Sequence, residues 1–315
     1  MVSISMSINK QLYYQMLRIR MVEEAIAREY PRQEMRCPTH LCVGQEAIAA
    51  GVCAALKKED VVFSTHRSHG HYLAKGGSLK AMIAELYGKA TGCSGGVGGS
   101  MHLVDLSANF LGAAPIVAST IPVAVGAALA RVMQKQPGIA VCFFGDAAVE
   151  EGTAHEAFNF AVLKRLPVLF VCENNMYSTV TNIRDRQPRR PIADVVRGHG
   201  MKADTVDGQD ARMVYKAANL FAGLLRNGKG PGLLECLTYR FLEHCGPHED
   251  GPQLRPAGEL ARWKKNDPIT RMALVCKEQE IRAMKEKIGT EIKDAFAFAR
   301  KSPFPRILGE ESVYA

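Results

Sequence analysis

The chain has 315 residues, of which 47% are apolar and 23% are charged, an ordinary composition for a globular protein. No apolar stretch reaches the ~20 residues of a membrane span, and residues 1–10 lack a signal-peptide core, so we expect a cytoplasmic protein without membrane contact. Its nine cysteines form no C-x-x-C pair, which favours buried thiols in a reducing compartment. The formal charge of +8 is densest at 184–190 (RDRQPRR). This cluster is too short and too poor in aromatic residues to indicate nucleic-acid binding, and a basic loop that meets an acidic cofactor or partner is the better interpretation.

The first quarter of the chain is predicted to be mainly helical. Apolar periodicity indicates helices at 9–31 and 45–57, and Ser78 is a candidate N-cap for a short amphipathic helix ending at Lys89. Between them, STHRSHGHYLAKGG (64–77) has three histidines and one arginine within six residues. Its serines and glycines indicate loop backbone close to a ligand.

The next two segments differ sharply in composition. The glycine-dense run GCSGGVGG (92–99) could cradle a phosphate, but it lacks the Walker pattern and a preceding strand, so the signal is weak. Residues 115–133 mix Ile, Val and Ala on all sides, which predicts a buried helix.

The most informative stretch is 139–178. An apolar run at 139–144, a helix-period segment at 154–162 and a second apolar run at 167–172 predict a right-handed βαβ unit in a buried parallel sheet. Beyond it we predict further elements without an internal repeat or linker: helices at 191–198 and 210–226, strands at 203–207 and 232–241, and an amphipathic tail at 267–301. We therefore expect one α/β domain over 1–315, a parallel sheet with helices on both faces and helical extensions at both ends.

Polar residues follow both strands of the central unit. Asp146 comes after the first strand and Asn175 after the second. Because the carboxyl ends of neighbouring parallel strands line a ligand crevice, both side chains should face it. A carboxylate, an amide oxygen and a backbone carbonyl suit Mg²⁺ or Ca²⁺. Alternatively, Asp146 caps the next helix and 174–175 forms a turn, and spacing alone leaves both interpretations open.

The order Gly145-Asp146-Ala147, then Asn174-Asn175, matches the thiamine diphosphate motif. Residues 145–178 resemble the alpha subunit of the decarboxylating component of 2-oxo acid dehydrogenases, the family of the pyruvate, acetoin and branched-chain enzymes. The likeness extends from the first helix to about Pro268. Its other landmarks are HLCVGQEA (40–47), HRSHGHYLAKGG (66–77), GGVGGSMH (95–102), PIVASTIPVAVGAALA (115–130), VDGQD (206–210) and TYRF (238–241).

This resemblance implies a thiamine diphosphate-binding fold and a site for thiamine diphosphate with Mg²⁺. The implied metal ligands are Asp146, the Asn175 side chain and the Tyr177 carbonyl. The implied cofactor-binding residues are His66, Arg67, Ile116, Val117, Asp146, Ala147, Ala148, Asn175, Tyr177 and His244. The implied catalytic histidines are His69, His244 and, near the substrate carboxylate, His40. Histidine suits proton transfer near neutral pH.

Several positions depart from the family pattern. His66 stands where tyrosine is usual, and Pro115 replaces a glycine. Ala147 replaces the second motif glycine and should be tolerated only if its φ is negative. The loop at 242–250 is unlike that of the pyruvate enzymes, and 184–190 has no Ser, Thr or Tyr to be phosphorylated.

The family's activating glutamate comes from a separate beta subunit, and no residue here is a convincing substitute. The resemblance therefore implies an α₂β₂ assembly that acts on a small 2-oxo acid or ketol and passes the acyl group to a lipoyl acyltransferase. Two alternatives remain open. One is a thiamine diphosphate-dependent carboligase or ketol transferase of a biosynthetic pathway without lipoyl transfer; the other is a non-catalytic scaffold.

Overall fold

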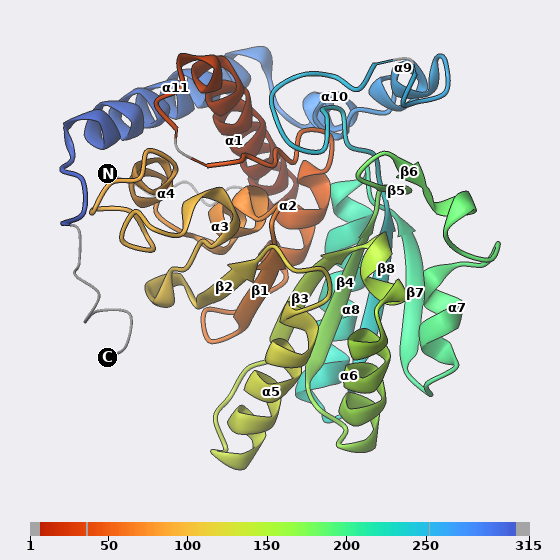
Figure 1. Ribbon diagram of the computed structural model, residues 1–315. Helices are drawn as coiled ribbons and strands as arrows, with labels where there is room; N and C mark the ends of the chain where they lie inside the picture. Colours follow the sequence, from red (N-terminus) through yellow and green to blue (C-terminus); the bar gives the residue numbers. More distant parts are fainter. Residues whose placement is uncertain (1–6, 36, 252, 307–315) are drawn as a thin grey trace.

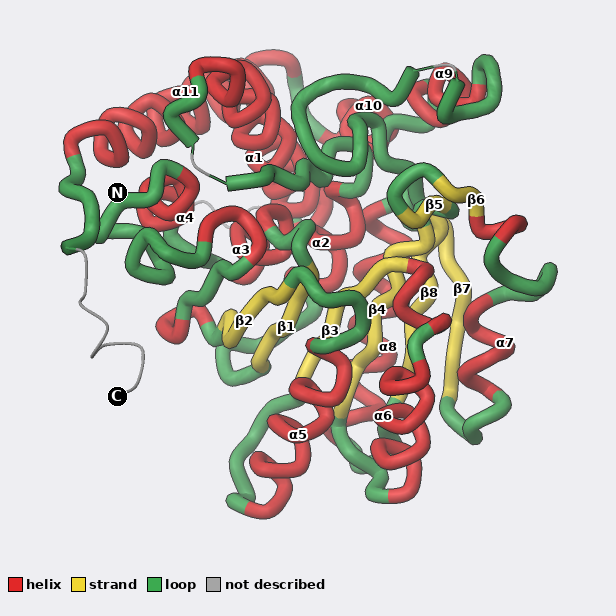
Figure 2. Tube along the Cα trace, viewed as in Figure 1, coloured by secondary structure: helices red, strands yellow, loops and turns green. Residues whose placement is uncertain are grey.

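Six parallel strands form the sheet at the centre of the molecule (Figures 1 and 2). The computed structural model describes residues 7–35, 37–251 and 253–306. In spatial order the strands are β2 (Phe110–Ala114), β1 (Val61–Thr65), β3 (Ala140–Gly145), β4 (Val168–Asn174), β8 (Gly232–Leu237) and β7 (Lys202–Asp207). A short antiparallel pair, β5 (Tyr177–Ser178) and β6 (Thr181–Asn182), follows β4.

Helices cover both faces of the sheet, which confirms the predicted α/β fold. The helices are α1 (Ile8–Glu29), α2 (Glu46–Ala54), α3 (His69–Lys75), α4 (Leu79–Leu86), α5 (Thr120–Met133), α6 (Gly152–Leu163), α7 (Ile192–Arg197), α8 (Ala211–Arg226), α9 (Glu259–Lys264), α10 (Pro268–Met272) and α11 (Glu278–Lys301). Helices α5, α6 and α7 lie on one face, and α2 and α8 lie on the other. None of the described helices combines the length and apolarity that a membrane span requires.

Strand β3 contributes side chains to the hydrophobic cores on both faces of the sheet. Its residues are apolar without interruption, as expected for a strand buried on both faces. Because side chains alternate along a strand, Val141 and Phe143 pack with α2 and α8, whereas Cys142 and Phe144 pack with α5 and α6. The central strands are thereby fixed in register, and so are the residues that follow them.

The long helices near the two ends of the described chain, α1 and α11, pack together. Helices α1 and α11 lie side by side (Figure 1). Two ion pairs join them, Lys10–Glu280 at 2.5 Å and Arg18–Glu291 at 2.6 Å. Apolar residues of both helices also share one small core.

Most predicted elements are present, and Ser78 is the N-cap of α4 as predicted. Asp210 caps α8 in the same way, by accepting backbone N–H bonds. Three expectations were wrong. The histidine-rich segment is not all loop, because α3 begins at His69. Strand β8 ends at Leu237 rather than 241, because the Phe241 N–H bonds to the Val43 carbonyl and draws the chain away from the sheet.

The third error concerns 115–133. The helix starts only at Thr120, and its outer side is open, with Met133 74% exposed in this chain. The sequence also gave no indication of β2, a short strand at the edge of the sheet that contains a glycine.

The glycine-rich run encloses a protein carboxylate. Glu85 of α4 accepts backbone N–H bonds from Ser94, Gly96, Gly98 and Gly99 at 2.8–2.9 Å. A Cβ on Gly92 would lie 2.2 Å from the Glu85 carboxylate oxygen. The loop's N–H groups are therefore already paired and hold Glu85 rather than a phosphate.

Replacing Gly51 by alanine should destabilise the chain, because α2 packs closely on α8 at this point. A Cβ there would lie 2.7 Å from Val214 Cγ1 and 2.9 Å from the Ala211 carbonyl. We expect Gly51→Ala to lower the free energy of unfolding by about 1–3 kcal/mol, measured by urea denaturation. Gly223→Ala, also in this helix pair but with open space around it, is the matched control and should stabilise by ~0.5–1 kcal/mol. Equal effects of the two changes would contradict close α2–α8 packing.

Candidate active site

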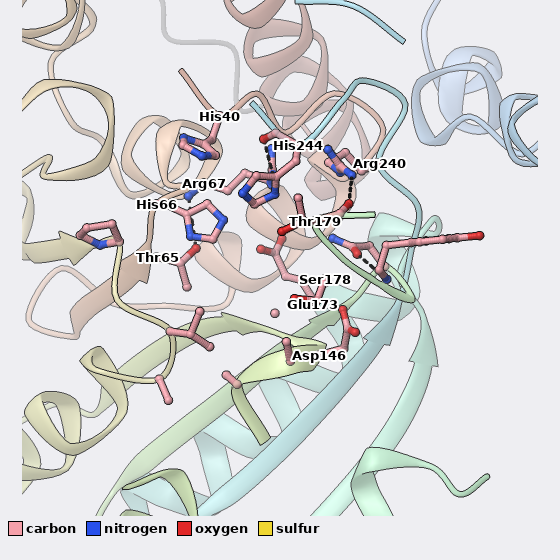
Figure 3. A pocket seen from close by; sticks show the side chains of 18 of the residues that line it. His40, Thr65, His66, Arg67, Asp146, Glu173, Ser178, Thr179, Arg240 and His244 are labelled. Atoms are coloured by element: carbon pink, nitrogen blue, oxygen red, sulfur yellow. Dashed lines mark hydrogen bonds between the residues drawn. The ribbon is translucent and has the colours of Figure 1, made fainter. Parts of the chain in front are cut away.

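A cavity of about 260 Å³ opens at the carboxyl ends of the strands (Figure 3). Segments that follow β1, β2, β3, β4 and β8 all contribute to its walls, as expected for an open α/β sheet. It brings together all but one of the residues predicted for the site. Those that line it are His40, His66, Arg67, Ile116, Val117, Asp146, Ala147, Ala148, Asn175, Tyr177 and His244.

Asp146 and Asn175 provide oxygen atoms at the sheet end of the cavity. Asp146 follows β3 directly and is 1% exposed. The Asn175 side-chain oxygen accepts the Tyr177 N–H at 3.1 Å, which orients the amide and brings Tyr177 back to the cavity wall. Burial raises the pKa of the Asp146 carboxyl, and nearby Arg186 opposes this shift. A carboxylate in such a place needs a cation beside it.

In this structure that cation is Arg186, from the basic loop after β6. Its guanidinium pairs with both Asp146 and Glu150. The next residue, Gln187, donates to the Asp146 carbonyl at 3.0 Å and to Glu150 at 2.7 Å. The basic loop is thus anchored on the turn that carries Asp146.

Arg67 is a buried cation without a carboxylate partner among the described residues. It is buried at the end of the segment after β1, and its guanidinium donates to the Leu41 carbonyl at 2.6 Å and the His244 carbonyl at 3.0 Å. Among the described residues, no carboxylate lies within ion-pair distance of it. Burial lowers the pKa of Arg67, because the charged form has lost its solvent. A buried guanidinium bonded to two carbonyls and, at 3.5 Å, to the neutral His244 ring is a ready partner for an anion.

Three histidines converge beside Arg67. Ring centroids of His40, His66 and His244 are 4.7, 5.0 and 5.3 Å apart (Figure 3). Burial, reinforced by the charge of Arg67, lowers the pKa of His66 to about 2, of His40 to about 3 and of His244 to about 4. All three rings are therefore neutral near pH 7.

His69 is the predicted site residue that the cavity leaves out. It is fully buried, with Nδ1 2.6 Å from Glu23 Oε1 and Nε2 2.8 Å from Ser100 Oγ. Glu23 also accepts the Cys42 N–H at 2.5 Å. This chain of bonds connects α1, α3 and the end of the glycine-rich run with the loop that carries His40.

The apolar wall comes from a strained loop between β2 and α5. Ile116 and Val117 are 73% and 41% exposed, and Ala118 behind them has φ of +64°. Positive φ at a non-glycine residue is costly and is concentrated at functional sites. Ala147 is not among the residues with positive φ, so its backbone can accept the methyl group that replaces the motif glycine.

The sequence interpretation missed several polar residues of the wall, among them Gln45, Glu173 and Arg240. Glu173 precedes the Asn174-Asn175 pair and lies 3.2 Å from His71 Nε2. Arg240 sits in the TYRF landmark; burial lowers its pKa to about 9, and it pairs with Asp250 at 3.4 Å. All three residues stand inside landmarks that the sequence analysis had recognised, and this was the available signal.

The chain is similar to known proteins along nearly its whole length. Residues 14–308 match the model of the family described as "Dehydrogenase E1 component". The chain is 38% identical over 300 residues to the alpha subunit of acetoin:2,6-dichlorophenolindophenol oxidoreductase from Bacillus subtilis, covering 94% of this chain and 90% of that protein. It is 36% identical to the pyruvate dehydrogenase E1 component subunit alpha of Zymomonas mobilis, covering 96% and 86%.

A plant relative extends the comparison. The chloroplastic pyruvate dehydrogenase E1 component subunit alpha-3 of Arabidopsis thaliana is 37% identical over 307 residues, covering 94% of this chain and 71% of that protein. A family model that spans nearly the whole chain, together with relatives of this identity and coverage, shows that the chain belongs to the dehydrogenase E1 component family, as an alpha subunit.

Proposed function

We propose that this chain is the alpha subunit of a thiamine diphosphate- and Mg²⁺-dependent dehydrogenase that acts on a small 2-oxo acid or ketol of the pyruvate or acetoin type. The observation that carries the proposal is the cavity itself. It pairs a buried guanidinium that lacks an anion with an oxygen set suited to a hard cation.

The residues fit a diphosphate-bearing group. Buried polar atoms of three cavity residues have no hydrogen-bond partner among the described residues: His40 Nδ1, Gln45 Oε1 and Arg240 Nη1. Buried polar groups are normally satisfied, so these atoms point to a polar ligand. The exposed Ile116 and Val117 offer an apolar surface to a ring.

Each end of the cavity then has a role. Asp146, the Asn175 amide oxygen and the Tyr177 carbonyl would hold Mg²⁺, and Arg67 would bind a terminal phosphate oxygen. When bound, thiamine diphosphate supplies a carbon nucleophile and an electron sink for the substrate carbonyl. His40 and His244, as neutral imidazoles, can donate or accept a proton at the substrate oxygens. His69, with both nitrogens engaged, would position the His40 loop rather than touch substrate.

A beta subunit completes this proposal. Glu173 and Asp146 are the carboxylates among the described cavity residues, and each already has a partner, His71 or Arg186. An activating carboxylate would therefore come from another chain. The exposed apolar side of α5 and α6, which includes Leu163 at 70% exposure, offers a docking surface for it. The acyl product would pass to a lipoyl acyltransferase.

The activity is tested with the chain purified together with its beta subunit, thiamine diphosphate and Mg²⁺. We expect reduction of an artificial electron acceptor that requires pyruvate, acetoin or a similar small 2-oxo acid or ketol. Formation of a condensation product without acceptor-dependent turnover would instead support a carboligase, and the absence of both would favour a scaffold.

Asp146→Asn should strongly weaken Mg²⁺-dependent cofactor binding, because it removes the charged metal ligand while keeping the shape of the side chain. We expect thiamine diphosphate affinity, measured by calorimetry at fixed Mg²⁺, to fall on the order of 100-fold. Asp185→Asn, at an exposed carboxylate of the basic loop, is the control and should leave it unchanged. Retention of affinity by Asp146→Asn would refute the proposed metal site.

Arg186→Gln should strengthen metal binding, because the guanidinium now occupies the carboxylate that the metal needs. We expect the Mg²⁺ concentration for half-maximal cofactor binding to fall roughly 3- to 10-fold, equivalent to about 1 kcal/mol of lost competition. Arg184→Gln, on the same loop but exposed, should have no effect. A higher Mg²⁺ requirement in Arg186→Gln would show that Arg186 supports the loaded site instead of competing with the metal.

A further inference from the structure

The basic loop between β6 and α7 has more positive charge than the sheet end of the active-site cavity uses. Residues 184–190 contain four arginines and one aspartate. Of these arginines, Arg186 pairs with carboxylates of the turn after β3. Arg184, Arg189 and Arg190 form no ion pair and no side-chain hydrogen bond within the described part of the chain. Their charge is therefore available to a partner from outside the chain.

The unpaired arginines line a hollow of about 800 Å³ beside the edge of the sheet. The basic loop forms one wall, and the carboxyl-terminal parts of β4, β8 and β7 form the other, on the face that α7 covers (Figure 1). Among the described residues, none lines both this hollow and the active-site cavity. Asn174 lines the hollow and Asn175 lines the cavity, so the end of β4 lies between the two. A hollow of this size can enclose a small metabolite.

Arg189 and Arg190 lie in a short segment whose backbone is restricted. Pro188 and Pro191 flank the two arginines, and the proline ring fixes φ. Next to this segment, Gln187 donates to a backbone carbonyl at 3.0 Å and to a carboxylate at 2.7 Å of the turn after β3. Because the segment is already restricted, less conformational entropy is lost when it binds a ligand.

Glu235 is the carboxylate among the described lining residues, and it does not neutralise the arginines. It is 1% exposed and accepts hydrogen bonds from Asn174 Nδ2 at 2.8 Å, Thr205 Oγ1 at 2.9 Å and the Ala193 N–H at 3.1 Å. Three uncharged donors thus satisfy this buried carboxylate, whereas the arginines are exposed. The balance of charge in the hollow is positive and favours an anion.

We propose that this hollow binds a small molecule that carries two or more phosphate or carboxylate groups, with Arg189 and Arg190 as its main contacts. A guanidinium group can form two parallel hydrogen bonds with a phosphate or a carboxylate, so two adjacent arginines suit a ligand with more than one such group. The site is separate from the one proposed for thiamine diphosphate and does not depend on it.

The other lining residues favour a small metabolite over a nucleic acid or a protein. None of the described lining residues is aromatic, so the hollow has no side chain on which a base could stack. An acidic protein would need a broad contact area, whereas a hollow encloses a compact ligand. Ile183 and Leu237 offer apolar contact to the carbon part of a metabolite.

The test is titration calorimetry of the full chain with tripolyphosphate and, in a separate arm, with citrate, in the presence of EDTA and at physiological ionic strength. We expect at least one probe to bind, and the two arms show whether phosphate or carboxylate is preferred. Arg189→Gln and Arg190→Gln should each weaken binding on the order of 10-fold. Arg282→Gln, which removes an exposed arginine of α11, is the matched control and should bind as the unmodified chain does. A probe bound at Arg67 instead would not respond to the loop variants.

A second pair of variants tests the hollow without changing an arginine. Leu237→Glu places a carboxylate on its wall and should weaken probe binding on the order of 10-fold by repulsion. Leu274→Glu adds the same charge at a side chain that is 97% exposed outside the hollow, and it should have no effect. A melting curve of each variant verifies that it is folded.

Three results would each overturn the proposal. They are the absence of binding by both probes, unchanged binding by the folded Arg189→Gln and Arg190→Gln chains, and an equal loss of binding in Arg282→Gln. The last result would show that the probe responds only to the overall positive charge of the chain.

Discussion

The buried guanidinium of Arg67 is the interaction on which the site depends. Its two bonds to backbone carbonyls join residues far apart in sequence, with Leu41 26 positions away and His244 177 positions away. Each of these carbonyls belongs to or adjoins one of the clustered histidines, and His66 is the immediate neighbour of Arg67. One side chain thus links three loops, and its charge-assisted hydrogen bonds are stronger than neutral ones.

The same guanidinium controls the electrostatics of the cavity. Its positive charge, added to burial, keeps the surrounding imidazoles neutral. At the sheet end, Asp146 is balanced by Arg186, whereas Arg67 has only uncharged partners, two carbonyls and the His244 ring. The free chain therefore has a cation in the place proposed for Mg²⁺ and an unmatched cation where an anion is expected. Binding of a metal and a diphosphate together would correct both imbalances, which makes joint binding more favourable than binding of either alone.

Residues whose position depends on a local sequence pattern could be predicted, whereas contacts between residues far apart in the sequence could not. Asp146 and Asn175 could be placed from sequence because each directly follows an apolar strand, and parallel strands bring their carboxyl ends to one edge. The position of Arg67 at the site came from family resemblance, but its bonds to Leu41 and His244 follow no local pattern. His69 shows the opposite failure: it stands in a recognised landmark, yet its side chain points to Glu23 and Ser100. A motif identifies a segment, whereas side-chain direction depends on helix phase within the packed fold.

The two ends of the cavity are built in different ways. Asp146 and Asn175 follow strands of the sheet, whereas the three histidines lie on loops or next to them. The oxygen end rests on β3 and β4, whose side chains are fixed by two cores and cannot shift without repacking both. The histidine end consists of loops held together by hydrogen bonds, among them those that Arg67 donates to Leu41 and His244. Changes such as His66 and the unusual 242–250 loop fall at this second end. Loops on a rigid scaffold can accept such changes at little cost to the core, so the chemistry of the histidine end can change while the sheet end retains the oxygen atoms of Asp146 and Asn175.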